Sequence, residues 1–303
     1  MSISLNGVCP LPHLGVIRVE GADAVKFLQG QLTQDFALLG PGQARLAAYC
    51  SPKGRMQASF IGWRDGAQDV LLVCSADILE ATRKRLSMFV LRAKAVLRDA
   101  SAEYQLRGLL GDAARAFGEA EPWQLTQADG ASVVHLYPAD GIPRCLWLAP
   151  QGVALPVGTE LPAALWQWTE VRSGVATLTA PIVEAYVPQM LNYESIGGVN
   201  FKKGCYPGQE VVARSQFRGI LKRRAFVAHA DAPLQAGQEV FHASDSTQPC
   251  GTVAQAAPAP TGGFDAVVSM QISAAQGGRL SVGTPDGPTL QLCALPYLLL
   301  ADV

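Results

Sequence analysis

The pattern of hydrophobic and polar positions predicts mixed strands and helices over about the first 225 residues. A short β-branched run at 16–19 predicts a strand, and the apolar positions within 24–32 then follow helical spacing. Two further strands are expected around 56–61 and 70–74, where short apolar runs occur. No clean strand–helix–strand repeat and no glycine-rich phosphate loop accompanies them, so the pattern does not favour a nucleotide-binding Rossmann or P-loop domain.

Two longer helices are expected in the same region. Ser75 or Asp77 caps the first, whose apolar residues at helical spacing are Ile78, Leu86, Phe89 and Val90. The second covers 161–173, and its apolar stripe consists of Leu161, Ala164, Leu165, Trp168 and Val171. Gly174 suits the position just after this helix. Trp166 lies off the stripe, which leaves it free to face a cavity or to lie partly exposed at the surface.

The rest of the pattern predicts hairpins and turns. Residues 133–137 and 144–148 are expected to pair around Asp140-Gly141, a favoured two-residue turn. The polar, alanine-rich stretch at 111–130 is expected to be a surface insertion. From about residue 225 onward, short apolar runs alternate with Gly, Pro, Asp and Gln turns, which predicts a small antiparallel barrel or sandwich.

Composition narrows the class of protein. The chain has 303 residues, of which 49% are apolar and 16% charged, so it is long enough for about two globular domains without disulfide or metal staples. A net charge of −1 excludes a globally basic nucleic-acid binder. No apolar run is long enough to span a bilayer, and the first residues lack the features of a signal peptide, so we expect a cytoplasmic protein without a membrane partner.

The cysteines and histidines are scattered. Seven cysteines, an odd number, are at least 24 residues apart and form no CxxC pair, so neither a disulfide framework nor a locally encoded metal site is expected. Most of these thiols are expected to be buried packing residues. Cys205 is the exception, because Lys202-Lys203-Gly204 precede it and Tyr206-Pro207-Gly208 follow it. Nearby ammonium groups favour a thiolate, so Cys205 is a candidate functional thiol, although an inert buried cysteine stays open.

The segment around this cysteine carries a concentrated positive charge. Between Lys202 and Arg224 there are seven basic residues and one acidic residue, Glu210, so the local net charge is +6. This predicts a local anion site, with a solvated charged face as the alternative. Gln209 and Glu210 either bind the N–H edge of a heterocycle or begin the helix expected at 211–214.

Residues 203–210 read KGCYPGQE, which resembles the signature of the YgfZ-type folate-binding proteins. These are relatives of the glycine-cleavage T-protein and include a mitochondrial iron–sulfur assembly branch. Further segments resemble the family: GAD at 21–23, FLQGQLT at 27–33, CSPKGR at 50–55, PQMLN at 188–192, VVAR at 211–214 with Arg218-Gly219, and LPY at 295–297. The resemblance thus covers nearly the whole chain and is strongest over 186–224.

The resemblance implies an α+β fold of three lobes around a central folate cavity, with a C-terminal antiparallel β-barrel. We expect a discontinuous folate-binding domain at 1–50 plus 140–225, a second lobe at 51–139 and the barrel at 226–303. Trp166 matches one of two folate-contacting tryptophans of the bacterial family. Leu14, with His13 beside it, occupies the position of the other.

The same resemblance implies the site and the function. The folate, as tetrahydrofolate or another form, is expected to contact Trp166, Tyr206, Gln209, Glu210 and Arg214, with Cys205 and Lys203 as the chemically active pair. The implied role is assembly or repair of iron–sulfur proteins, including tRNA-modifying enzymes as client partners, with a transient iron–sulfur cluster among the expected cofactors. The alternative is a tetrahydrofolate-dependent aminomethyltransferase-like enzyme, for which Asp23, Asp35 and Glu194 are candidate carboxylates. Direct nucleic-acid binding by the basic run has thin support, because Phe217 is its one interleaved aromatic.

Overall fold

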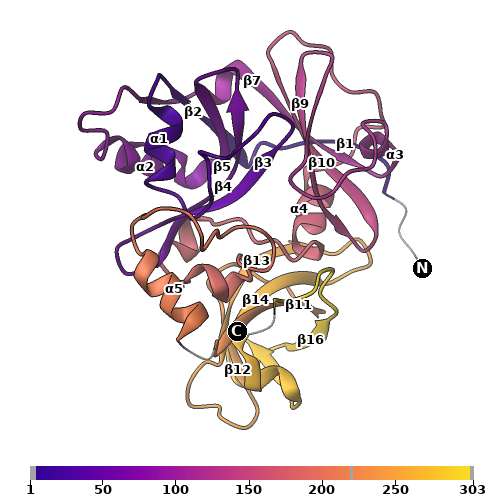
Figure 1. The fold of residues 1–303 in the computed structure, drawn as a ribbon. Helices are drawn as coiled ribbons and strands as arrows, with labels where there is room; N and C mark the ends of the chain where they lie inside the picture. Colours follow the sequence, from indigo (N-terminus) through magenta and orange to yellow (C-terminus); the bar gives the residue numbers. More distant parts are fainter. Residues whose placement is uncertain (1–4, 219–220, 301–303) are drawn as a thin grey trace.

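A computed structural model describes residues 5–218 and 221–300. Two five-stranded antiparallel sheets and a closed six-stranded barrel form three lobes, and helix α4 (Ala163–Arg172) lies between them (Figure 1). This confirms the expected α+β fold with a C-terminal barrel. Gly219, the last residue of the family-like segment after the motif, lies outside the described residues.

The first sheet contains the strands predicted near the N-terminus. Its order is β3 (Ala44–Cys50), β4 (Met56–Asp65), β5 (Asp69–Ser75), β2 (Leu14–Glu20) and β6 (Val96–Asp99). Helices α1 (Ala24–Gln29) and α2 (Ala76–Ser87) contact this sheet. The predicted strands and the presence of both helices are therefore confirmed, although α1 ends at Gln29, before the predicted apolar position Leu32.

Helix α2 is shorter than its apolar spacing suggests. Ser75 precedes it as N-cap, but the helix ends at Ser87, so Phe89 and Val90 lie in the turn beyond it. Phe89 is 47% exposed. The prediction that these two residues belong to the helix is wrong, because the chain tightens into turns after Leu86 and Ser87 rather than continuing the helical ladder.

The second sheet confirms the predicted hairpin. Its order is β1 (Gly7–Pro10), β7 (Tyr104–Leu110), β10 (Ile142–Pro150), β9 (Ala131–Ala139) and β8 (Leu125–Ala128). Asp140 and Gly141 connect β9 to β10 with φ values of 49° and 79°, as a primed two-residue turn requires. A short 3₁₀ helix, η1 (Ser101–Glu103), precedes β7.

The stretch at 111–130 is part of this lobe rather than a surface insertion. It forms α3 (Asp112–Arg115) and strand β8, and Ala113 and Ala114 are buried against the sheet. Polar composition suggested exposure, but alanine side chains are small enough to pack closely on strands. The insertion prediction is therefore wrong for α3 and β8, whereas residues 118–121 between them are exposed, as the polar composition suggested.

The sheets divide the chain differently from the expected lobes. The hairpin of β3 and β4 crosses the boundary expected at residue 50, and β1 pairs with β7 in the second sheet. Each sheet therefore combines strands from both expected N-terminal lobes. Where the domain boundaries lie stays a prediction.

The C-terminal region forms the expected barrel. The closed strand order is β11 (Arg223–Ala230), β14 (Phe264–Gln271), β13 (Gly251–Pro258), β12 (Glu239–His242), β15 (Leu280–Val282) and β16 (Thr289–Cys293). A 3₁₀ helix, η4 (Ile272–Gln276), follows β14. Closure pairs every sheet edge, which removes the exposed edges that favour aggregation.

The segment that connects α4 to the barrel contains η2 (Ala180–Ile182), η3 (Pro188–Leu191) and helix α5 (Gln209–Phe217). A buried ion pair ties this segment to the barrel, because Arg224 Nη1 donates to Glu194 Oε1 at 2.6 Å. Asn192 adds hydrogen bonds to both backbone groups of Ala225. The barrel and the connecting segment therefore form one packed unit.

We expect Glu194→Gln to lower the free energy of unfolding by about 3 kcal/mol, because it removes one charge from the buried ion pair between Glu194 and Arg224. Glu210→Gln is the matched control, since Glu210 pairs with Arg214 at the surface and such pairs contribute about 0–1 kcal/mol. Urea denaturation of both variants measures the difference. Equal losses in the two variants would show that the buried pair adds no more than the surface pair.

Candidate functional site

The KGCYPGQE segment lies against the turn at 51–54, another of the family-like segments. Gly208 precedes α5 in a left-handed conformation, with φ of 81°. A Cβ atom on Gly208 would lie 2.4 Å from the Ser51 carbonyl oxygen, and one on Gly54 would lie 2.8 Å from Val211 Cβ. Glycine is therefore required on both sides of this contact, which explains why both segments carry one.

Lys203 anchors the same segment to a third one. Its side chain is buried, and its ammonium group donates to the carbonyl oxygens of Gln29 and Leu32, each at 2.5 Å. The ammonium also lies 4.9 Å from the centre of the buried Tyr206 ring. Segments 27–33 and 50–55, which are far apart from the motif in sequence, therefore both contact it, the first through Lys203 and the second through Gly208.

Burial lowers the pKa of Lys203 to about 8, while the charges of Asp35 and Cys205 act in the opposite direction. A fully charged ammonium is costly in such surroundings, and the two carbonyl contacts offset part of that cost. Lys203 therefore changes charge close to neutral pH, next to the candidate thiol.

Cys205 is exposed, unlike most other thiols of the chain. Cys9, Cys50, Cys74, Cys145 and Cys250 are buried, and Cys293 is half-buried. Burial raises the pKa of Cys50 and Cys74 to about 12, so these thiols stay protonated at neutral pH. The prediction that most cysteines serve packing is confirmed for the five buried ones, and Cys205 is accessible to a reaction partner.

The remaining motif residues lie on or beside helix α5. Gln209 and Glu210 occupy its first turn, so they begin the helix, as one of the two open interpretations expected. Glu210 forms an exposed ion pair with Arg214. Those two residues line a pocket on the outer side of α5 together with Ala213, Phe217 and Arg218.

The basic run is less exposed than its formal charge suggests. Lys203 is buried, Arg223 donates to the Cys250 carbonyl oxygen, and Arg224 pairs with Glu194 inside the protein. The exposed cations are Lys202, Arg214, Arg218 and Lys222. The predicted charge of +6 therefore overstates the positive surface, because three of the seven cations serve internal contacts.

Trp166 lies elsewhere, in the centre of the molecule. Its indole ring is fully buried and packs on Gly108, where a Cβ atom would lie 2.2 Å from the ring. Trp166 lines a cavity of about 40 Å³ between the two sheets and α4, as its off-stripe position predicted. Leu14, at the expected position of the second tryptophan, lines the same cavity.

Glu170 also lines this cavity and was not predicted as a site residue. Its carboxylate accepts a hydrogen bond of 2.9 Å from Trp166 Nε1 and lies 3.3 Å from His13 Nε2. The buried Arg144 guanidinium stacks 4.4 Å from the centre of the Trp166 ring, and its Nε has no hydrogen-bond partner among the described residues. The spacing of Trp166 and Glu170, four residues apart on a predicted helix, is the sequence signal that places these side chains together.

Helix α4 buries more than the predicted stripe. Trp166 and Glu170 face the cavity, whereas Trp168 faces the barrel and donates to Asp265 at 2.7 Å. Ala164, a stripe member, is exposed. The stripe prediction fails at Ala164, which lies in the first turn of α4, and at Leu161, because the helix begins only at Ala163.

The candidate carboxylates Asp23, Asp35 and Glu194 have structural contacts instead. Asp23 accepts from the Lys94 backbone, Asp35 accepts from the Leu38 backbone, and Glu194 pairs with Arg224. The described structure therefore has two separate regions of interest, the Cys205 segment and the cavity beside Trp166. Whether one ligand contacts both, as the sequence suggests, stays a prediction.

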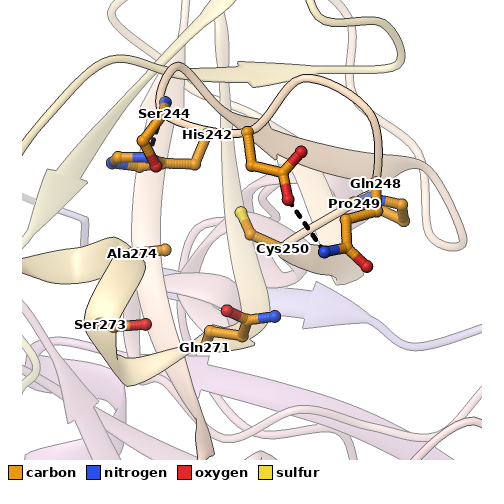
Figure 2. Close-up of a pocket in the computed structure, with 9 residues that line it drawn as sticks. His242, Ser244, Gln248, Pro249, Cys250, Gln271, Ser273 and Ala274 are labelled. Carbon is orange, nitrogen blue, oxygen red and sulfur yellow. Dashed lines mark hydrogen bonds between the residues drawn. The ribbon is translucent and has the colours of Figure 1, made fainter.

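A further pocket, of about 140 Å³, lies in the barrel, and Figure 2 shows His242, Cys250 and Gln271 around it. Both ring nitrogens of His242 are engaged, with Ser244 and with the Gly277 carbonyl oxygen. Burial raises the pKa of the Cys250 thiol. Both His242 nitrogens are therefore already in hydrogen bonds, and the raised pKa keeps the Cys250 thiol protonated.

Within residues 5–218 and 221–300, no group of three His, Cys, Asp or Glu side chains is placed to hold a metal ion. No helix in that part of the chain is long and apolar enough to cross a membrane.

Comparison with known proteins decides the family. No protein-family model matches the chain. The tRNA-modifying protein YgfZ of Cronobacter sakazakii is 30% identical over 304 residues, which cover 93% of this chain and 90% of that protein. The YgfZ of Edwardsiella ictaluri is 31% identical and covers 93% and 89% of the two chains. This chain belongs to the YgfZ family.

Two other comparisons found similar proteins outside those named YgfZ. An uncharacterized protein of Haemophilus influenzae is 30% identical over 235 residues, 76% of each chain. The crystal structure of the glycine cleavage system aminomethyltransferase T of Bartonella henselae superimposes with a TM-score of 0.69. At 18% identity, covering 97% of this chain and 87% of that one, this match shows that the YgfZ-family chain shares the T-protein fold.

We expect the unfolding free energy to rise with pH more steeply in the wild-type protein than in Lys203→Met. Between pH about 8 and 10.5 the unfolded lysine binds a proton that the folded one has released, so stability increases through this window, by about 2–3 kcal/mol. Urea unfolding at both ends of the window measures the slope. Lys202→Met, a control at the exposed neighbouring lysine, is expected to keep the wild-type slope, and parallel curves for Lys203→Met would contradict the buried ammonium.

Proposed function

We propose that this chain is a folate-binding accessory protein that supports the assembly or repair of iron–sulfur proteins, including enzymes that modify tRNA, through Cys205. The observation that carries the proposal is the exposed Cys205 thiol on a turn held by the buried Lys203 ammonium. Family relatives named tRNA-modifying proteins support the link to tRNA modification. The T-protein fold supports a folate ligand.

The thiol suits transient contact with a client protein. A thiolate is the form that reacts and that binds iron, and an exposed position gives a partner access to it. Lys203 and Tyr206 act as positioning residues, because their burial fixes the turn on either side of Cys205. One thiolate is not enough to hold a cluster, which usually needs four ligands, so a cluster would be shared with the client.

The residues around Trp166 fit a folate in kind. A buried indole offers an aromatic face, and the Glu170 carboxylate offers an acceptor for the N–H groups of a pterin edge. Ligand sites for molecules of this size usually measure about 300–1,000 Å³, so the cavity of about 40 Å³ has to widen on binding. When bound, a tetrahydrofolate would supply one-carbon chemistry.

We expect Trp166→Ala to weaken tetrahydrofolate binding about tenfold, because the aromatic contact is lost. Trp168→Ala is the matched control, since it removes a buried indole that faces the barrel instead of the cavity. Titration calorimetry measures both affinities, and thermal unfolding shows whether the variants remain folded. Arg214→Ala, measured alongside, decides whether the ligand also reaches α5. Tight binding by Trp166→Ala and loss in Trp168→Ala would place the ligand elsewhere.

A second function, a tetrahydrofolate-dependent aminomethyltransferase-like reaction, is favoured by one observation. Glu170 provides the cavity with the positioned carboxylate that proton transfer in such a reaction requires. We favour the accessory function because this second reaction gives the exposed Cys205 no role. A turnover assay with tetrahydrofolate and an aminomethyl donor separates the two, since the accessory function predicts no turnover.

We expect Cys205→Ala to fail to restore iron–sulfur enzyme activity and tRNA methylthiolation in cells that lack the gene. Cys293→Ala, which removes the half-buried thiol of the barrel, is the control and is expected to restore both. Aconitase-type activity and the modified nucleoside content of tRNA measure the outcome. Full rescue by Cys205→Ala would remove the thiol from the function.

A further inference from the structure

The outer side of helix α5 forms an exposed surface that includes Glu210 and Arg214, two of the expected folate contacts. We call it the α5 surface, and its exposed residues are Lys202, Arg214, Phe217 and Arg218. Helix α5 lies at the edge of the molecule in Figure 1. A pocket of about 320 Å³ on this surface is lined by Glu210, Ala213, Arg214, Phe217 and Arg218. This volume lies within the range of sites for small organic groups.

Phe217 provides an aromatic platform at this pocket. Its side chain is 54% exposed, although an aromatic ring gains free energy by burial. The half-buried Phe201 ring supports it edge to face, with ring centres 5.2 Å apart and an interplanar angle of 72°. Phe217 is therefore held in place at the surface and available for stacking.

The charges around Phe217 favour an anion. Arg218 and Lys202 have no ion-pair partner among the residues that the structure describes. Arg214 pairs with Glu210, and both side chains are exposed, so water weakens the pair and leaves the guanidinium available. Two guanidinium groups and one carboxylate thus line the pocket together with the Phe217 ring. The Phe201 ring packs against Phe217 in the last turn of α5, and Lys202 is the next residue after Phe201 in the sequence.

We propose that the α5 surface binds a single-stranded polynucleotide, with a base stacked on Phe217 and phosphates on Arg218, Lys202 and Arg214. Stacking on an aromatic ring beside mobile cations is the usual way in which proteins hold unpaired strands. A base within a duplex is already stacked and offers no free face. A specific protein partner usually covers about 800 Å² of apolar and polar surface, and one ring among cations provides little apolar area for it. The inference needs neither the folate cavity nor Cys205.

We expect Phe217→Ala to weaken binding of a fluorescent single-stranded oligoadenylate about 5- to 100-fold, the range seen when one stacking ring is removed. Arg218→Ala is expected to weaken binding as well and to flatten the dependence of log K on log salt by about 0.7. Phe217→Tyr keeps the ring and is expected to bind like the wild type, whereas Phe217→Leu keeps only an apolar side chain and is expected to bind like Phe217→Ala. Fluorescence anisotropy over a salt series measures all four variants.

Two controls make the result decisive. Arg92→Ala removes an exposed cation from the α2–β6 turn and is expected to leave binding unchanged, so equal loss in Arg92→Ala and Arg218→Ala would overturn the site. A polyglutamate peptide carries negative charge without bases, and if it competes as well as oligoadenylate the surface binds acidic protein instead. Parallel titrations with the ribo- and deoxyribo-oligomers identify which polynucleotide is bound. Wild-type protein that binds neither would refute the inference.

Discussion

The burial of the Lys203 ammonium is the constraint on which the Cys205 segment depends. A charge inside protein is tolerated only where oxygen atoms surround it, and here the chain supplies the carbonyl groups of Gln29 and Leu32. The end of α1 and the motif are thereby fixed to each other. Tyr206 is buried on the other side of the cysteine. The backbone is therefore fixed on both sides of Cys205, and the Cys205 thiol between them is exposed to solvent.

Local patterns predicted the local structure well. The hairpin around Asp140-Gly141 and strands β2, β4 and β5 of the first sheet follow from periodicity and turn chemistry, which act over a few residues. The pattern did not predict β3 and β6, and after residue 225 it left a barrel and a sandwich open until the family resemblance favoured the barrel. The errors arose where tertiary contacts override composition. Ala113 and Ala114 pack against the second sheet, although the polar residues around them in the sequence suggested exposure. Phe89 lies beyond the last turn of helix α2.

The site was predictable in its parts and not in its assembly. Sequence motifs marked Lys203, Cys205 and Trp166, and family resemblance gave their expected roles. The contact of Lys203 with residues more than 170 positions away depends on the packing of α1, which no local pattern reveals. Formal charge was the least reliable guide, because it does not show that Arg223 and Arg224 are used inside the protein.

Helix α4 connects the cavity to the barrel mechanically. Trp166 rests on Gly108 without room for one additional methyl group, so only glycine fits at position 108 while the indole keeps this place. Two residues on, Trp168 donates to Asp265 of the barrel. Helix α4 is thereby a shared wall, with one indole lining the cavity and the next one bonded to the C-terminal lobe.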